Sequence, residues 1–483
     1  MRRNLRQLNM VAIFWVRRSL REKDNIALVE ASKENEEVIP FYVVDDDYFK
    51  TADLGYPRVK FWHDAVESFK EKLSGQECKD LVVRKGKPLK QVKKIVEEAG
   101  ADAVYYNRDY TPYSRKRDEK VAEELDVPVK SFKDIVMFEK EEILTNSGTP
   151  YKVYTYYKKK WFKKEKRRPQ EVEDYATPDL ESDEIPSVQE LGFEQPDGFE
   201  WEWNPSREGG QDRIEEFKEN IWNYDENRDY AWRDETSRLS PHLKFGTVSI
   251  REVFWEAERI KARNPNSDTG GVETWQEELA WRDYYMQILW NYPHEVDEPF
   301  MDKYRGNEPD WDSKEESPEK WERWVEGRTG YPFVDAGMRQ LKKTGFMHNR
   351  LRMVVTNFSC KDLWLDWRDV HDYFSKMFVD AEIAAMVGGI QWSYSIGTDA
   401  QPYFRVFNPT SQAERYDPDG EYIRKWVPEL KDVPDNFIHE PWKMNKLQQE
   451  DCSVIIGEDY PEPIVDHDEK RKESVERFEK LEE

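Results

Sequence analysis

The run Val11-Ala12-Ile13-Phe14-Trp15-Val16 is the first of several short apolar segments in the N-terminal part of the chain. Similar β-rich segments follow at Val38–Val44, Leu81–Val83, Ala103–Tyr106 and Val127–Val129. Between them, apolar residues recur with helical spacing over Val59–Leu73 and Leu89–Glu98. Strands that alternate with helices form parallel sheets through right-handed crossovers. Residues 10–137 are therefore predicted to be an α/β domain with a doubly wound parallel sheet.

The rest of the chain divides where this pattern changes. Residues 138–204 are rich in Pro, Asp and Glu and lack a regular period, so we expect an interdomain linker there. From 205 to 455, helical periodicity with many Trp and Tyr residues predicts an all-helical domain. The charged tail, residues 456–483, is expected to be frayed or loosely helical.

The composition limits the partners that the chain can have. Its 483 residues are 14% aromatic, which argues against disorder. The formal net charge of -25 discourages general binding to nucleic acid, so a DNA site must be a local basic patch. The densest basic run, from Lys158 to Arg168, could hold phosphates. Such runs are more often solvated helix faces, and we favour that interpretation.

Cysteine and histidine usage bears on metals and on the cell compartment. Cys78, Cys360 and Cys452 are scattered, which excludes a disulfide scaffold and a cysteine-based zinc site and fits a reducing cytoplasm. The seven histidines show no ligand spacing, so we expect no structural metal. No apolar run approaches membrane-spanning length. We therefore expect a cytoplasmic protein that has no contact with membranes.

Two stretches of the helical part combine residues that suit a planar ligand. Gly388-Gly389-Ile390-Gln391-Trp392 is followed by Gly397-Thr398-Asp399-Ala400 and by Tyr403-Phe404-Arg405-Val406-Phe407-Asn408-Pro409. Glycines permit close approach of the backbone, and Trp392 offers a stacking face. Upstream lies Met347-His348-Asn349-Arg350-Leu351-Arg352-Met353, in which Asn349 and Met353 are one helical turn apart.

Two further motifs are open to more than one interpretation. The turn from Thr236 to Ser240 offers hydroxyls, a guanidinium and backbone amides before a predicted helix, which suits a pyrophosphate. Taken alone, it is more often an ordinary helix cap. In the segment from Trp275 to Arg282, Glu278, Trp281 and Arg282 share one helical face. An acid beside a Trp on such a face is usually the solvated edge of a core.

Taken in order and at their spacing, these motifs resemble the photolyase/cryptochrome family, most closely the class I photolyases that repair cyclobutane pyrimidine dimers. The resemblance extends over nearly the whole chain. It includes Trp15-Val16-Arg17-Arg18-Ser19-Leu20-Arg21 and Tyr151-Lys152-Val153-Tyr154-Thr155, which resembles the family's segment between the two domains. It implies a monomeric, light-driven lyase that binds FAD and acts on DNA containing pyrimidine dimers.

The resemblance also implies roles for individual residues. Glu278 would hydrogen-bond the damaged base, Trp281 and Trp392 would wall the flipped-out dimer, and Asn349 and Met353 would line the pocket. Arg228, Arg350 and Gln412 would join Glu278, Trp281, Asn349 and Trp392 in contacting DNA. The residues expected to bind FAD are Tyr224, Thr236, Ser237, Arg238, Leu239, Ser240, Trp275, Arg282, Asn349, Arg352, Asp380, Glu382 and Met386.

Three positions depart from the family pattern. The family relays electrons to its flavin through three tryptophans, and Trp311 and Trp367 match the outer and middle ones, but the proximal position is Ile390. The residue that faces flavin N5, commonly Asn in photolyases, is Met386, which cannot donate a strong hydrogen bond. Glu382 stands where Asp is usual.

Related functions stay open at this point. The branch that repairs (6-4) lesions carries histidines where this chain has Asn349 and Met353, so these two residues favour cyclobutane dimers. A cryptochrome-like blue-light photoreceptor without repair activity is the alternative, favoured by Met386 and Ile390. A flavin-bearing single-strand DNA binder is a third possibility. No Lys matches the family's folate site, so an antenna chromophore would be a deazaflavin or a folate held differently, or absent.

Overall fold

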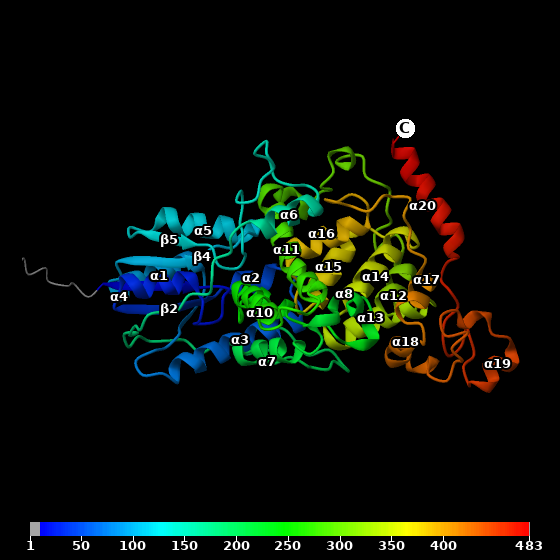
Figure 1. The fold of residues 1–483 in the computed structure, drawn as a ribbon, viewed down its shortest axis with the longest axis horizontal. Coiled ribbons are helices and arrows are strands. Elements are labelled where there is room, and N and C mark those ends of the chain that lie inside the picture. Colours follow the sequence, from blue (N-terminus) through cyan, green and yellow to red (C-terminus); the bar gives the residue numbers. More distant parts are fainter. Residues whose placement is uncertain (1–9, 483) are drawn as a thin grey trace, which may run out of the picture.

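The computed structural model describes residues 10–482 and begins with a five-stranded sheet (Figure 1). Residues 1–9 and 483 lie outside the described part. The strand order is β3-β2-β1-β4-β5, and every neighbouring pair is parallel, which confirms the doubly wound α/β prediction. The strands are β1 Val11–Val16, β2 Glu37–Val44, β3 Val82–Lys85, β4 Ala103–Asn107 and β5 Val129–Phe132. The last strand starts after Pro128, which has no N–H to donate to a ladder.

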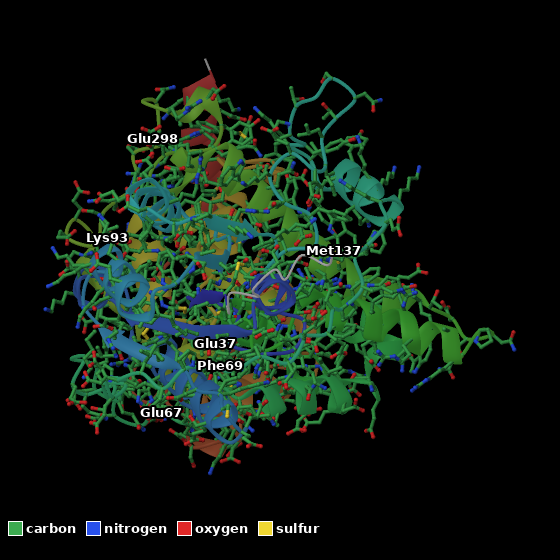
Figure 2. All side chains as sticks on the ribbon, turned by 90° about the vertical axis from the view of Figure 1, so that its left-hand side faces the viewer. Glu37, Glu67, Phe69, Lys93, Met137 and Glu298 are labelled. Atoms are coloured by element: carbon green, nitrogen blue, oxygen red, sulfur yellow. The ribbon has the colours of Figure 1, made fainter. Side chains whose placement is uncertain are left out.

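Helices cover both faces of this sheet. Side chains of β1 alternate: Phe14 packs in one apolar cluster with α1 (Ile26–Glu34) and α3 (Tyr56–Ser74), and Trp15 packs in another with α4 (Pro88–Ala99) and α5 (Pro112–Glu124). Seen from the α/β end, Phe69 of α3 and Lys93 of α4 lie on opposite sides of the strands (Figure 2). Burial on both faces explains why the strands are apolar throughout.

The segment between the two parts is more ordered than its composition suggests. It contains one helix, α6 (Tyr154–Lys163), whose Tyr157 and Trp161 are buried with residues of the helical part. Beyond it, the chain runs back along the sheet, where Ala176 forms a bridge with Glu37. Tyr175 and Trp203 are buried in the cluster on that face. The segment is therefore packed against both parts of the molecule.

The C-terminal half is helical, as predicted (Figure 1). Among the described residues, no helix is long and apolar enough to span a bilayer. The α-helices of this C-terminal half are α7 Arg207–Phe217, α8 Tyr224–Asn227, α9 Ser240–Phe245, α10 Ile250–Arg263, α11 Gly270–Asn291, α12 Pro318–Val325, α13 Pro332–Thr344, α14 Asn349–Lys361, α15 Trp367–Met377, α16 Ile383–Ser393, α17 Pro409–Tyr416, α18 Glu421–Trp426, α19 Lys446–Asp451 and α20 His467–Glu482.

The charged tail differs from the expectation of a frayed segment. It forms α20, which lies along the edge of the helical part (Figure 1). Phe478 is fully buried against Trp311, Trp364 and Tyr403, and His467 pairs with buried Asp362 at 2.6 Å. A few apolar side chains in a very polar helix carry little weight in a sequence pattern, yet the burial of Phe478 fixes the helix in place.

Buried charges join the α/β part to the helical part. Arg251 of α10 contacts Asp24 at 2.9 Å and Asp134 at 2.6 Å, and Arg21 also contacts Asp134, at 2.8 Å. All four side chains are at most 2% exposed. Burial alone would raise the pKa of Asp134, but Arg21 and Arg251 lower it well below its ordinary value. Its contribution to stability is therefore present above the ordinary Asp pKa and is lost in acid as the pH falls through the lowered value.

Replacing Arg251 should destabilise the protein. Arg251→Leu leaves buried carboxylates without one of their partners, which costs about 3–5 kcal/mol. Urea unfolding followed by circular dichroism measures the loss. Arg259→Leu on the same helix is the control, because Arg259 is 54% exposed and pairs only with Glu256. Equal stability of the two variants would contradict a role for the buried cluster.

Candidate functional site

A buried carboxylate organises one end of the predicted site. Asp380 accepts a hydrogen bond from the Ser240 hydroxyl at 2.5 Å and forms an ion pair with Arg352 Nη2 at 2.9 Å. Arg352 Nε also donates to the Met347 carbonyl at 2.8 Å, and the guanidinium lies 4.0 Å from the Phe378 ring centroid. These contacts fix Asp380, which is 6% exposed, beside the partly exposed guanidinium.

The turn before α9 lies close to α11. The Trp275 indole donates to the Ser237 hydroxyl at 3.3 Å, and Tyr224 and Leu239 are buried in the same apolar cluster as Trp275. Arg238 has a positive φ of 49° and pairs with Asp234 at 2.7 Å and with Glu202 at 3.1 Å. Thus the hydroxyls of Ser237 and Ser240 are oriented, while the Arg238 guanidinium is already held by carboxylates. Thr236 is partly exposed beside them.

Two predicted flavin residues, Glu382 and Arg282, face the boundary with the α/β part. Glu382 accepts from Arg18, which follows β1, and lies 3.7 Å from Arg282. Arg282 also donates to the Ile135 and Leu243 carbonyls. Burial disfavours the charge on Glu382, but Arg18 and the nearby cations Lys244 and Arg282 lower its pKa below the ordinary value. Glu382 therefore links the two parts of the molecule as an anion.

Helix α16 carries the positions that depart from the family pattern. Met386 and Ile390 are one turn apart; Ile390 is 3% exposed, whereas Met386 lines a cavity of about 660 Å³. A Cβ on Gly388 would come within 2.3 Å of the Tyr285 ring, so this glycine is needed for packing against α11. A Cβ on Gly389 would meet open space, as a site for a flat ligand beside the helix requires.

The predicted lesion residues come from α11, α14 and α16, which pack together. Asn349 Nδ2 lies 4.0 Å from Met353 Sδ at the start of α14, and Trp392 packs against Phe407 at 6.4 Å between ring centroids. The Trp281 indole stacks on Tyr154 and Tyr285. The sequence did not predict that Tyr154 and Tyr285 would lie here, because no motif assigned either residue to the wall of the pocket.

Alternating charges connect the predicted DNA contacts. Glu278 pairs with Arg228 at 2.5 Å, and the next residue, Asp229, pairs with Arg350 at 2.7 Å. Burial raises the pKa of Glu278, and Arg228 opposes that shift. Arg350 also lies 4.2 Å from the Tyr416 ring of α17. The two guanidiniums are thus balanced by two carboxylates before DNA arrives. On α17, the buried side-chain oxygen of Gln412 accepts no hydrogen bond from the described residues.

The basic run on α6 is mostly engaged within the protein. Lys158 pairs with Glu277 at 2.8 Å, Lys160 donates to the Leu144 carbonyl, and Lys164 donates to the Glu142 carbonyl at 2.8 Å. Lys166 is buried and donates to backbone carbonyls of α6. These contacts favour the interpretation of this run as a structural helix face.

The two tryptophans predicted to carry electrons lie in different surroundings. Trp367 is fully buried and lines the cavity that Met386 also lines. Trp311 is 5.2 Å from the Tyr394 ring and 6.1 Å from the Trp364 ring. Within residues 10–482, no ring contact joins Trp311 to Trp367. Tyr394 lies one turn after Ile390, which makes it an aromatic neighbour that the tryptophan pattern alone would miss.

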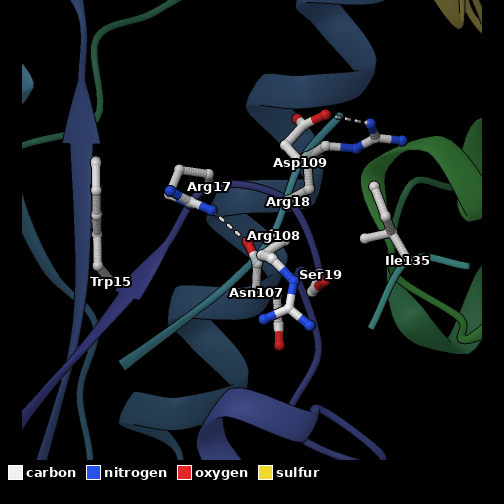
Figure 3. A pocket seen from close by; sticks show the side chains of 8 residues that line it. All are labelled: Trp15, Arg17, Arg18, Ser19, Asn107, Arg108, Asp109 and Ile135. Atoms are coloured by element: carbon white, nitrogen blue, oxygen red, sulfur yellow. Dashed lines mark hydrogen bonds and ion pairs between the residues drawn. The ribbon is translucent and has the colours of Figure 1, made fainter. Parts of the chain in front are cut away.

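The cavity that Met386 lines extends to the carboxyl edge of the sheet. There the strand order reverses between β1 and β4, the usual place for ligands in doubly wound sheets. Figure 3 shows a small pocket beside this cavity, with Arg17 and Arg18 after β1, Asn107 at the end of β4 and Asp109 paired with Arg18. The cavity wall also includes Tyr42, Tyr48, Trp62, Tyr113 and Arg117.

Comparison with known proteins accounts for this arrangement. Residues 12–177 match the family model described as DNA photolyase, and residues 275–480 match the FAD binding domain of DNA photolyase. The chain belongs to the photolyase/cryptochrome family. Its photolyase domain contains the sheet, and its FAD-binding domain contains α14 and α16 with Asp380 between α15 and α16.

Individual relatives are similar to this photolyase-family chain over nearly its full length. A deoxyribodipyrimidine photo-lyase of Halobacterium salinarum is 38% identical and covers 97% of this chain and 98% of its own. A class III photolyase from Agrobacterium tumefaciens superposes with a TM-score of 0.90 at 30% identity, covering 98% of both chains. An archaeal photolyase from Sulfolobus tokodaii with two FAD molecules gives a TM-score of 0.80 at 31% identity, over 98% and 100% of the chains.

The residues present fit the FAD that this family binds. Asp380 and Arg352 are fixed by their neighbours, the hydroxyl of Ser237 is oriented, and the open space at Gly389 leaves room beside α16. We expect Ser237 and its turn to hold phosphates and the Asp380–Arg352 pair to lie beside the ring system. The individual contacts to FAD stay predictions.

Loss of the Asp380 carboxylate should weaken FAD retention. In Asp380→Asn, Arg352 loses its ionic partner, and loss of one charge-assisted hydrogen bond is worth about 1.5–3 kcal/mol. We expect a Kd for FAD that is higher by about 10-fold or more. Heat-released FAD per chain and titration of the apoprotein measure the effect. Asp435→Asn is the control, since Asp435 is 76% exposed and pairs with Arg424. FAD content equal to that of the control would remove Asp380 from the flavin site.

Proposed function

We propose that the protein is a light-driven, FAD-dependent lyase that splits cyclobutane pyrimidine dimers in DNA. The feature that supports this most is that the side chains which the resemblance assigns to the dimer pocket lie on α16 and on two helices that pack against it. Glu278 and Trp281 on α11, Asn349 and Met353 on α14 and Trp392 on α16 come from three helices that pack together. A photoreceptor or a single-strand DNA binder has no need of all five.

The residues of this pocket would act by binding and orienting the lesion. Photolyases act on bases that have left the duplex, so apolar walls must replace base stacking. Trp281 and Trp392 would supply these walls. Glu278, fixed by Arg228, would hydrogen-bond the base edge. The chemistry that bound, reduced FAD would supply is light-driven donation of one electron to the dimer, with return of that electron after the ring opens.

DNA binding would depend on few charges. Because Arg228 and Arg350 are each paired with a carboxylate, the local positive potential is modest, in keeping with the net charge of -25. We infer that these arginines and Gln412 contact the backbone around the flipped lesion, and that the protein recognises lesion shape and backbone geometry instead of base sequence.

We infer that the cavity at the sheet edge holds a second chromophore. Tyr42, Trp62 and Tyr113 supply aromatic walls, while Arg17 and Arg117 supply positive charge. This lining suits a planar, anionic molecule, a description that fits both a deazaflavin cofactor and a folate. The Sulfolobus tokodaii relative with two FAD molecules supports an antenna cofactor of this kind.

A cryptochrome-like photoreceptor is the second candidate, supported by Met386 and Ile390. Met386 offers no strong hydrogen-bond donor, and Ile390 cannot be oxidised by an excited flavin. Both residues point to an altered redox cycle. Light-dependent repair of a defined thymine dimer by chemically reduced protein separates the two candidates: repair supports the lyase, and its absence in FAD-loaded protein supports the receptor.

Glu278→Ala should weaken repair while leaving FAD content nearly unchanged. It removes a charge-assisted hydrogen bond to the lesion worth about 1.5–3 kcal/mol. Repair per absorbed photon, measured with pre-reduced protein at limiting dimer DNA, should fall about 10-fold. Glu277→Ala is the matched control, because that side chain pairs only with Lys158. A repair yield equal in both variants would make Glu278 an ordinary helix-surface acid.

Ile390→Trp should accelerate photoreduction of oxidised FAD and spare repair by pre-reduced protein. The new indole would stand between the flavin region and Trp367, although the larger ring overpacks a buried site at roughly 1–3 kcal/mol. Flavin bleaching under blue light with an external reductant measures the rate. If photoreduction is already fast in the unmodified protein and Trp367→Phe does not slow it, another donor such as Tyr394 or Tyr403 replaces the proximal tryptophan.

A further inference from the structure

Helix α6 is capped by a residue from the far end of the chain. The residue before it, Val153, has no side chain that can accept a hydrogen bond, so the helix lacks a cap of its own. Asp399, in the loop after α16, accepts the Tyr154 N–H with Oδ2 at 3.1 Å. Asp399 adopts a positive φ of 46°, a conformation that aspartate tolerates better than most residues. The loop therefore determines where Tyr154 begins the helix.

Two more contacts fix Tyr154. The neighbouring Thr398 donates its hydroxyl proton to the Lys152 carbonyl at 3.0 Å, which holds the chain just before the helix. At the other end of the side chain, the Tyr154 hydroxyl donates to the Glu277 carbonyl of α11 at 2.9 Å. The ring is thus held from its backbone and from its hydroxyl, so its plane is set by two separate elements.

The ring plane of Tyr154 lies directly against Trp281. Their centroids are 3.4 Å apart with an interplanar angle of 10°, the shortest ring separation among the described residues. Tyr285, one turn along α11, stacks on the same indole at 5.6 Å and 23°. Burial, together with Glu277 and Glu278, raises the pKa of Tyr154, so the phenol stays neutral and donates its hydrogen bond throughout the working pH range.

We propose that Tyr154 is a positioning residue for lesion binding, which backs the Trp281 indole and is itself placed by Asp399. The inference rests on the proposed function, in which Trp281 walls the flipped dimer. A wall that must replace base stacking works only if its plane is fixed before the lesion arrives. Undamaged bases stay in the duplex and do not reach Trp281. Replacing Tyr154 should therefore change the affinity for dimer-containing DNA without changing the affinity for undamaged DNA.

The test compares two duplexes of the same sequence, with and without one thymine dimer, on FAD-loaded protein. Tyr154→Leu removes the stacked ring, and we expect the Kd for the dimer duplex to rise about 3- to 10-fold, as for the loss of one aromatic pair. The Kd for the undamaged duplex and the FAD content should stay the same, while the Tm falls because a buried, hydrogen-bonded ring is lost. Tyr154→Phe keeps the ring and should restore affinity to within about twofold.

Three further variants separate a positioning role from a general loss of structure. Tyr156→Leu, on the same helix at a side chain that is 60% exposed, should change neither Kd. Asp399→Gly tolerates the positive φ but loses the acceptor for Tyr154 N–H, and it should weaken dimer binding in the same selective way. Asp399→Asn keeps an acceptor oxygen and should behave like the unmodified protein. If Tyr154→Leu fails to retain FAD, the comparison of Asp399→Gly with Asp399→Asn tests the positioning role instead.

The outcomes are distinct. Equal weakening for both duplexes, or no change for either, in Tyr154→Leu and Asp399→Gly overturns the positioning role while the proposed function stands. A wild-type protein that does not prefer the dimer duplex at all overturns the proposed function and this inference together. Selective weakening that Tyr154→Phe and Asp399→Asn both rescue supports the inference.

Discussion

Buried charge between the α/β part and the helical part is the constraint on which the site depends. Arg251 reaches from α10 to Asp24 and Asp134 of the α/β part with almost no exposure to solvent. Charges buried this deeply must be matched, because a single unpaired one is very costly. The same boundary carries the pair of Arg18 with Glu382, so the cavity at the sheet edge and the predicted flavin region are held in one fixed relation.

Helix α16 concentrates what is unusual in this chain. Its glycines serve packing and close approach: Gly388 faces the Tyr285 ring and Gly389 faces open space. The residues one turn apart, Met386 and Ile390, have changed from the family pattern while Trp392 has kept it. Binding of the lesion and supply of electrons make separate demands on the helix, since walls need shape and hydrogen bonds whereas electron donors need oxidisable rings. A helix that lacks an oxidisable ring at Ile390 can therefore still provide a wall for the lesion.

Electrostatics in the predicted DNA region follows from the acidity of the whole chain. Glu278, Arg228, Asp229 and Arg350 form a row of alternating charges, so each arginine is oriented by a neighbouring carboxylate. An anionic protein that binds DNA with few free cations gains less from general phosphate attraction. On the proposed function, selectivity would then come from the pocket itself, and the orientation of Trp281 and its neighbours would carry much of the discrimination.

The sequence by itself determined the parallel sheet and the family, because strand and helix periods are local and the motifs around Ser240, Asn349 and Trp392 keep their order and spacing. It predicted the five strands near their observed ends. It allowed a loosely helical tail, but it did not predict that α20 docks through the buried Phe478. Which partners meet across the fold was decided by tertiary structure alone: Glu382 with Arg18, and Asp399 with the start of α6. Such contacts join residues hundreds of positions apart, and packing, which no local period encodes, brings them together.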